Sequence, residues 1–182
     1  MRHLVAVLAL SLALPALAVE VAGVKVSDTT TVGGKTLVLN GAGLRTKVFF
    51  KVYVGALYLE QRSSDPAAIV AGDVAWKVTM TLKRDLDKES ILTAFKEGFE
   101  KNSSADLPKL LPGLDRIGTI LKDTKTGEVA EFAYVPGAGL TATAPGGATV
   151  TIEGKPFADA MLRIWLGEKP VQDSLKKELL GK

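Results

Sequence analysis

The sequence lacks cysteine, and its single histidine, His3, lies close to the amino terminus. A chain without cysteine forms no disulfide, offers no thiol nucleophile and cannot carry a lipid on a cysteine. Because no imidazole follows His3, Ser-His-Asp and Cys-His catalysis are excluded from the rest of the chain. Zinc and haem sites built on thiolate or imidazole ligands are excluded for the same reason. We therefore expect no metal and no cofactor.

Long apolar runs are confined to the amino terminus. Residues 1–18 contain an early arginine, an apolar run over Leu4–Leu14 and the small-residue pattern of Ala16–Ala18. The run is shorter than the roughly 20 residues that a bilayer-spanning helix needs, and an A-x-A pattern after it is typical of a secretory signal peptide. The sequence therefore predicts cleavage after Ala18, a single domain over residues 19–182 and a periplasmic or secreted location.

Charge of one sign is not concentrated anywhere. The chain has 23 Lys+Arg against 20 Asp+Glu, a formal net charge of +3. Without a basic cluster or stripe, we expect no nucleic-acid partner. No apolar run after the leader reaches 18 residues, so we expect no membrane span.

Strand and helix patterns follow one another without regular alternation. The most apolar of the expected strands is Val48–Leu59, whose valines and aromatic residues on both faces are typical of a central strand that is covered on both sides. We interpret Ser27–Gly34 as a break between strands. The other expected strands are Val19–Val26, Lys35–Leu44, Ala75–Leu82, Glu128–Tyr134, Leu140–Ala144 and Ala148–Ile152. The expected helices are Asp65–Ala71, Asp87–Asn102, Leu107–Leu121, Pro156–Leu166 and Pro170–Leu180. This order predicts an α+β fold with a mostly antiparallel sheet covered by helices.

Arg45 is the most informative polar residue. It ends the segment Leu39–Arg45, next to the most apolar strand, where a guanidinium beside an apolar pocket suits an anionic head group. The alternative is a strand-end arginine that is solvated or paired with an acidic residue. Tyr53, Tyr58 and Lys51 on the following strand are further ligand-binding candidates. By default the tyrosines are core or rim aromatics, and the lysine extends its stem along the apolar surface.

Several segments carry a family resemblance. Leu39–Arg45 (LNGAGLR) and Phe50–Leu59 (FKVYVGALYL) are similar to the first long hairpin of the chalcone isomerase superfamily. Phe157–Gly167, followed by Lys169–Val171, resembles the helix pair that closes the same fold, and Tyr134–Gly137 also fits. The likeness is strongest to the exported bacterial chalcone isomerase-like branch.

The resemblance implies an open-faced β-sandwich, with a large antiparallel sheet, helices on one face and a ligand cleft between them. The superfamily contains plant isomerases that close a chalcone to a flavanone, and fatty-acid-binding relatives without that activity. In the enzymes, an arginine after the Gly-Ala-Gly turn holds the ligand and its developing oxyanion, and Arg45 matches it. The fatty-acid-binding relatives keep an arginine with a nearby tyrosine to hold a carboxylate, which suits Arg45 with Tyr53 or Tyr58.

The other catalytic identities of the superfamily do not match. Tyr53 stands where the enzymes have a threonine that organises water. Glu89 and Lys96 fall near the positions of their tyrosine and asparagine. The last pocket hydroxyl is left open between Thr149 and Thr151. Because cyclisation needs charge stabilised where it develops, one arginine does not supply the full set.

Three hypotheses follow. The first is a non-catalytic exported binder of a hydrophobic, carboxylate-bearing small molecule such as a fatty acid, with Arg45, Tyr53, Tyr58 and Lys51 as ligand-binding residues. The second is an isomerase or cyclase acting on chalcone-like, enone or phenolic compounds, in which Arg45 is the electrophile and Tyr53 donates a proton or holds water. The third is an envelope interaction protein that uses the cleft or a sheet edge.

Overall fold

The computed structural model describes residues 18–182, so the predicted signal peptide, apart from Ala18, lies outside the described residues. Seven strands form one antiparallel sheet in which each strand pairs with its neighbours in the sequence, and a separate two-stranded hairpin precedes it. The strands are β1 (Ala18–Val21), β2 (Val24–Ser27), β3 (Thr29–Val32), β4 (Lys35–Lys47), β5 (Phe50–Leu59), β6 (Trp76–Leu82), β7 (Val129–Val135), β8 (Gly139–Thr143) and β9 (Thr149–Ile152). The helices are α1 (Pro66–Ala71), α2 (Lys88–Asn102), α3 (Leu107–Ile120), α4 (Lys155–Leu166) and α5 (Asp173–Leu179), with a 3-10 turn η1 (Ser104–Asp106).

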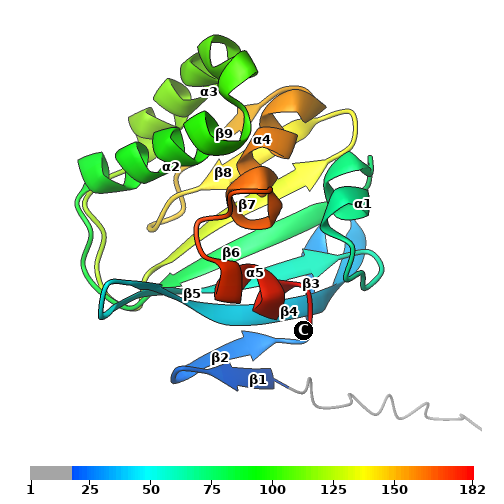
Figure 1. Ribbon diagram of the computed structural model, residues 1–182, viewed down its shortest axis with the longest axis vertical. Coiled ribbons are helices and arrows are strands. Elements are labelled where there is room, and N and C mark those ends of the chain that lie inside the picture. The colour runs from blue at the N-terminus through cyan, green and yellow to red at the C-terminus, as the bar shows by residue number, and fades with distance from the viewer. Residues whose placement is uncertain (1–17) are drawn as a thin grey trace, which may run out of the picture.

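The layers match the predicted fold class. Figure 1 shows α2, α3, α4 and α5 on one face of the curled sheet and the β1–β2 hairpin on the other. The expectation of an α+β fold, with a large antiparallel sheet and helices on one face, is confirmed. Within residues 18–182, no helix is long and apolar enough to cross a membrane.

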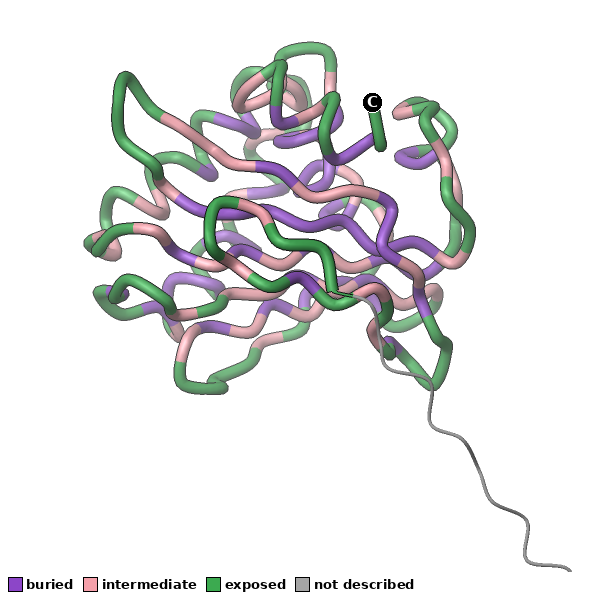
Figure 2. The backbone as a smooth tube through the Cα atoms, turned by 90° about the horizontal axis from the view of Figure 1, so that it is seen from below, coloured by how far each residue is buried: buried purple, intermediate pink, exposed green. Residues whose placement is uncertain are grey.

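The central strand β5 is buried on both faces, as its sequence predicts. Leu57 and Leu59 belong to the main core beneath the helices. Val54 and Tyr58 belong to a second core on the opposite face. Figure 2 shows the buried stretches running along the middle strands while the turns are exposed. The two cores explain why β5 is apolar at both odd and even positions.

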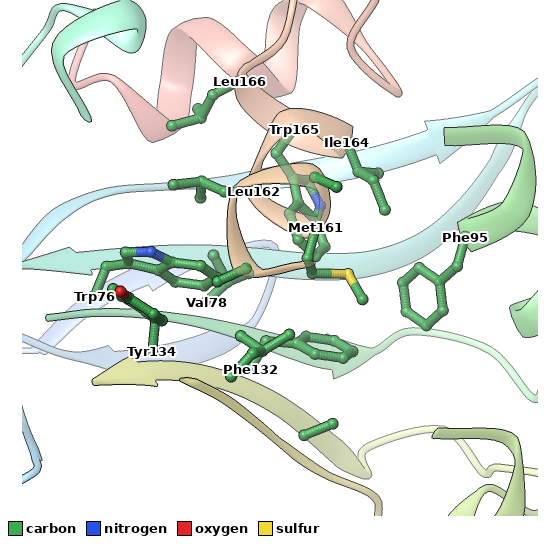
Figure 3. Close-up of a cluster of buried hydrophobic side chains, with 14 of the residues drawn as sticks. Trp76, Val78, Phe95, Phe132, Tyr134, Met161, Leu162, Ile164, Trp165 and Leu166 are labelled. Atoms are coloured by element: carbon green, nitrogen blue, oxygen red, sulfur yellow. The ribbon is translucent and has the colours of Figure 1, made fainter. Parts of the chain in front are cut away.

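The main core fills the space between the sheet and α4. Met161, Leu162 and Trp165 project from α4 toward β6 and β7 (Figure 3). The ring centroid of Phe132 on β7 lies 5.3 Å from that of Phe95 and 6.0 Å from that of Trp165. Side chains therefore pack the layer in which the resemblance places a ligand cleft.

The Gly-Ala-Gly segment of β4 lets α5 pack directly on the sheet. A Cβ atom added to Gly41 would lie 2.1 Å from the carbonyl oxygen of Glu178, and one added to Gly43 would lie 1.8 Å from its carboxylate. Beside them, the buried Asn40 amide donates to the carbonyls of Leu179 at 2.8 Å and Ser63 at 2.9 Å. The segment that carries the family resemblance is thus also the docking surface of the last helix.

Gly41→Ala is expected to lower the free energy of unfolding by about 1–3 kcal/mol, because the added methyl group forces α5 away from β4. Urea unfolding at neutral pH, followed by far-ultraviolet circular dichroism, measures the change. Gly118→Ala in α3 is the matched control, since its added Cβ would be 3.4 Å from Leu92, an ordinary contact. Equal stability of the Gly41 variant and the wild type would contradict the steric role of this glycine.

Two expectations for the first third of the chain are wrong. Ser27–Gly34 is not a break, because it contains the edge strand β3, whose threonines pair with the start of β4 across a turn at Gly33-Gly34. Val19–Val26 is not one strand but the β1–β2 hairpin, which turns at Ala22-Gly23 with φ angles of 48° and 79°. The first error comes from reading a polar stretch as an interruption, although an edge strand needs only one apolar face. The second comes from the opposite mistake, because the turn at Ala22-Gly23 was read as part of a continuous strand.

Three element boundaries also differ by two residues or more. The strand expected over Lys35–Leu44 extends to Lys47, so Arg45 lies within it. The strand expected over Val48–Leu59 begins at Phe50, because Val48 adopts a φ of 59° in the turn that joins β4 to β5. The helix expected to begin at Pro170 begins at Asp173, after the N-cap Gln172. Asp87 is confirmed as the N-cap of α2, since its carboxylate accepts a hydrogen bond from the Ser90 amide at 2.7 Å.

Candidate functional site

Arg45 lies near the end of β4, directly opposite Tyr53 on β5. Its side chain is half-buried, and its Nη1 atom donates to the carbonyl oxygen of Thr46 and, at 3.3 Å, to the side-chain oxygen of Gln172. None of the ion pairs found within residues 18–182 includes Arg45. Its guanidinium is therefore held by neutral acceptors, which an anion would replace with a stronger, charge-assisted interaction.

Gln172 anchors the start of α5 to the same strand. Its side-chain oxygen accepts from the Thr46 amide at 2.8 Å, and its side-chain nitrogen donates to the Leu44 carbonyl at 3.4 Å. The Arg45 guanidinium and the Thr46 amide thus share one acceptor, the side-chain oxygen of the α5 N-cap. A displacement of α5 from β4 would release the guanidinium at the same time.

Tyr53 is buried beneath α4, and only 6% of it is exposed. Its hydroxyl oxygen accepts a hydrogen bond of 2.8 Å from the indole N–H of Trp165. Burial raises the pKa of Tyr53 to about 12, although the Trp165 hydrogen bond and the Arg45 charge act in the opposite direction. The phenol is therefore protonated at neutral pH, and in the part of the chain that the structure describes it accepts a hydrogen bond but donates none.

Tyr53→Phe is expected to make the free energy of unfolding fall less steeply as the pH rises above 10. The unfolded phenol ionises near pH 10, whereas the folded one stays neutral to about pH 12, so the unfolded state loses its proton first as pH rises. Between these values Tyr53 therefore lowers the free energy of unfolding by about 1.4 kcal/mol per pH unit. Urea unfolding at several pH values from 8 to 12 measures the slope. Identical slopes for the variant and the wild type above pH 10 would contradict this role.

The other two predicted site residues are not cross-strand neighbours of Arg45. Tyr58 lies in the second core, on the far face of the sheet, and its hydroxyl donates to the Ser27 carbonyl at 3.0 Å. Its pKa is raised, mainly by burial and then by the charges of Glu131 and Asp28. Lys51 is exposed at the start of β5. Arg45 and Tyr53 are therefore the only two of the four candidates that the structure brings together as cross-strand neighbours.

Sequence reasoning did not assign Trp165 or Gln172 to this site. The helical spacing of α4 predicts a buried Trp165, and this is confirmed, since 1% of it is exposed. A buried indole needs an acceptor for its N–H, and that requirement was the available signal. Gln172 gave no comparable signal, because its role depends on where α5 docks.

The remaining positions that the resemblance assigns to catalysis lie at the surface. Glu89 and Lys96 are exposed on α2, and Lys96 lies 3.9 Å from the Glu100 carboxylate. Thr149 and Thr151 are exposed on β9. These residues do not extend the Arg45–Tyr53 pair into a larger polar constellation.

Two surface pockets lie elsewhere on the molecule. One, of about 560 Å³, lies among α1 and the last turns of α2 and α4 and includes Lys101, Arg163 and Lys176. The other, of about 470 Å³, lies between the end of β5 and α1 and includes Arg62 and Trp76. Arg45 and Tyr53 line neither pocket. The space behind this pair is filled by side chains of the main core.

A family model described as chalcone isomerase-like matches residues 18–181. The chain belongs to the chalcone isomerase-like family. The family resemblance found in the sequence is thereby confirmed. A comparison with curated proteins finds no significant match.

The solved structure of a fatty-acid binding protein from Arabidopsis thaliana is similar to this chalcone isomerase-like protein. The TM-score is 0.70 at 14% sequence identity, and the match covers 87% of this chain and 92% of the plant chain. At this identity the likeness shows a shared fold. The sheet and the helices that cover it are therefore a fold that the two proteins have in common.

Proposed function

We propose that this protein is a non-catalytic binder of a hydrophobic small molecule with a carboxylate, of the fatty-acid type, held by Arg45 and Tyr53. The observation that carries the proposal is the juxtaposition, within residues 18–182, of a guanidinium without a carboxylate partner and a protonated, buried phenol at the edge of an apolar core. A guanidinium can bind a carboxylate with two parallel hydrogen bonds, and the phenol can donate a third.

The acyl chain of such a ligand needs room between β5 and the closing helices. That layer is filled in this structure, so binding requires α5 and the side chains beneath it to move away from β4 and β5. The short helix α5 is suited to this movement. Its start is held to β4 by the Gln172 side chain, which contacts Arg45 and Thr46, so a ligand at Arg45 acts on the contacts that hold the helix. The carboxylate would take over the place of the Gln172 oxygen on Arg45.

The similarity to a fatty-acid binding protein supports this ligand class, and the leader-like residues 1–18 support an exported location. Amino-terminal sequencing of the protein from the envelope fraction of its host tests export, and a mature chain that begins at Val19 is the expected result. A chain that keeps residues 1–18 in the soluble cell fraction would contradict it.

Native mass spectrometry with added palmitate tests the binding function. We expect a complex of one palmitate per chain, together with copurified acyl ligands when the protein is isolated from its own compartment. A protein that is isolated empty and ignores added palmitate would overturn the proposal.

The isomerase hypothesis is tested separately by following the absorbance of added chalcones. The exposure of Glu89 and Lys96 argues against isomerase activity, because Arg45 and Tyr53 are then the two candidate residues left to stabilise developing charge. A rate above the uncatalysed cyclisation that is lost in Arg45→Ala would establish an enzyme instead of a binder.

A further inference from the structure

The turn between β4 and β5 presents an apolar tip to solvent. Val48 is 78% exposed, Phe49 94% and Phe50 60%, and these are the three most exposed large hydrophobic residues within residues 18–182. We refer to Lys47–Lys51 as the hairpin tip. Three consecutive exposed apolar residues at the end of a long hairpin contribute nothing to either core, and such patches mark interaction surfaces.

The backbone of the hairpin tip is strained. Val48 adopts a φ of 59°, in the left-handed region that a β-branched residue rarely occupies. Glycine or asparagine would relieve this cost at an exposed turn. A strained and exposed valine is therefore not explained by the requirements of the fold, and strain of this kind gathers at functional sites.

Cationic residues lie on both sides of the apolar tip in the sequence, and a third contacts it. Lys47 and Lys51 flank it and are both exposed. The Arg84 guanidinium, which follows β6, lies 4.9 Å from the centroid of the Phe50 ring. The neighbouring carboxylate of Asp85 is turned to another partner, since it pairs with Lys125 at 2.9 Å. An exposed apolar tip with three positively charged residues beside it is complementary to a bilayer surface with anionic head groups.

We propose that the hairpin tip inserts into the interfacial region of an anionic lipid bilayer. Val48, Phe49 and Phe50 enter the boundary between head groups and acyl chains, while Lys47, Lys51 and Arg84 contact lipid phosphates. The register of the hairpin places Arg45 two residues before Lys47, so the site of the proposed function lies at the same end of the sheet. The membrane contact itself rests on the tip alone and does not depend on ligand binding.

Cosedimentation with vesicles tests the contact. The purified protein is expected to bind vesicles of equal phosphatidylcholine and phosphatidylglycerol at low salt, to bind less at high salt, and to bind pure phosphatidylcholine far more weakly. The variant Phe49→Ser/Phe50→Ser should weaken binding at least tenfold. Lys47→Glu/Lys51→Glu should also weaken vesicle binding at least tenfold, because the loss of each lysine near an anionic surface lowers the affinity about fivefold.

Matched controls come from the loop after α1 and from helices α2 and α3. Val74→Ser removes another exposed apolar side chain, and Lys101→Glu/Lys109→Glu makes the same charge change at exposed positions. Both controls should bind vesicles as the wild type does. Phe49→Trp supplies a local reporter, because Trp76 and Trp165 are buried. Its emission should shift to the blue when phosphatidylglycerol vesicles are added.

Wild-type protein that ignores phosphatidylglycerol vesicles at low salt would overturn the proposal, as would a doubly serine-substituted tip that binds them normally. Concentration-dependent dimers in sedimentation velocity that disappear with the serine variant, without vesicle binding, would assign the tip to a second copy of the chain and also overturn it.

Discussion

Arg45→Ala is expected to weaken palmitate binding roughly 10- to 100-fold, which is the range for the loss of hydrogen bonds to a charged group. Among the described residues the guanidinium has neutral partners alone, the Thr46 carbonyl and the Gln172 amide oxygen, so its charge is available to a carboxylate. Titration of the purified protein with palmitate, followed by native mass spectrometry, measures the change. Arg45→Lys should retain part of the affinity, because it keeps the charge but loses the two-pronged geometry.

A neutral ligand separates the role of Arg45 from general damage to the fold. Hexadecanol has the same number of carbon atoms as palmitate but a hydroxyl in place of the carboxylate. Its affinity should be nearly equal for the wild type and for Arg45→Ala. Arg116→Ala, an exposed arginine of α3, is the control for surface charge. Unchanged palmitate binding in Arg45→Ala would place the ligand elsewhere. Equal losses for palmitate and hexadecanol would show a structural role instead.

Trp165→Ala is expected to lower the free energy of unfolding by about 3–5 kcal/mol, the range for deleting a buried tryptophan. The indole is 1% exposed, packs against Phe132 and donates to Tyr53, so the variant leaves both a cavity and a buried hydroxyl without its partner. Urea unfolding followed by far-ultraviolet circular dichroism measures the loss.

The two parts of this effect can be separated. Trp165→Phe keeps most of the packing but removes the indole N–H, so its loss should be smaller than that of Trp165→Ala. Arg116→Ala should leave the midpoint of unfolding unchanged. A Trp165→Ala variant that unfolds at the wild-type urea concentration would contradict the view that the layer between α4 and the sheet is tightly packed.

The sequence was sufficient where a residue's environment follows from its neighbours in the chain. The two-faced burial of β5 and the buried stripe of α4 were both predictable from apolar spacing. The opposite placement of Tyr53 and Tyr58 was predictable too, because residues an odd number apart on a regular strand point to opposite faces. Grouping both tyrosines in one site overlooked that rule.

Long-range contacts could not be predicted in the same way. The Tyr53–Trp165 hydrogen bond joins residues 112 positions apart, and the shared role of Gln172 appears only once α5 lies on β4. The Thr-rich strand β3 was missed because its pairing with β4, rather than its own hydrophobicity, makes it a strand. A closed layer beside Arg45 likewise depends on how side chains from separate elements fill one space.

The order of strands in the sheet has a consequence for the order in which the chain folds during synthesis. Each of β3 to β9 pairs with the strand next to it in the chain, so successive hairpins can assemble as the polypeptide emerges. The final helix must return across 139 residues to the Asn40 amide beside the glycines of β4, farther than the 112 residues between Trp165 of α4 and Tyr53. We therefore expect α5 to be the last element to dock, and a nascent chain without it to keep the Arg45 strand uncovered.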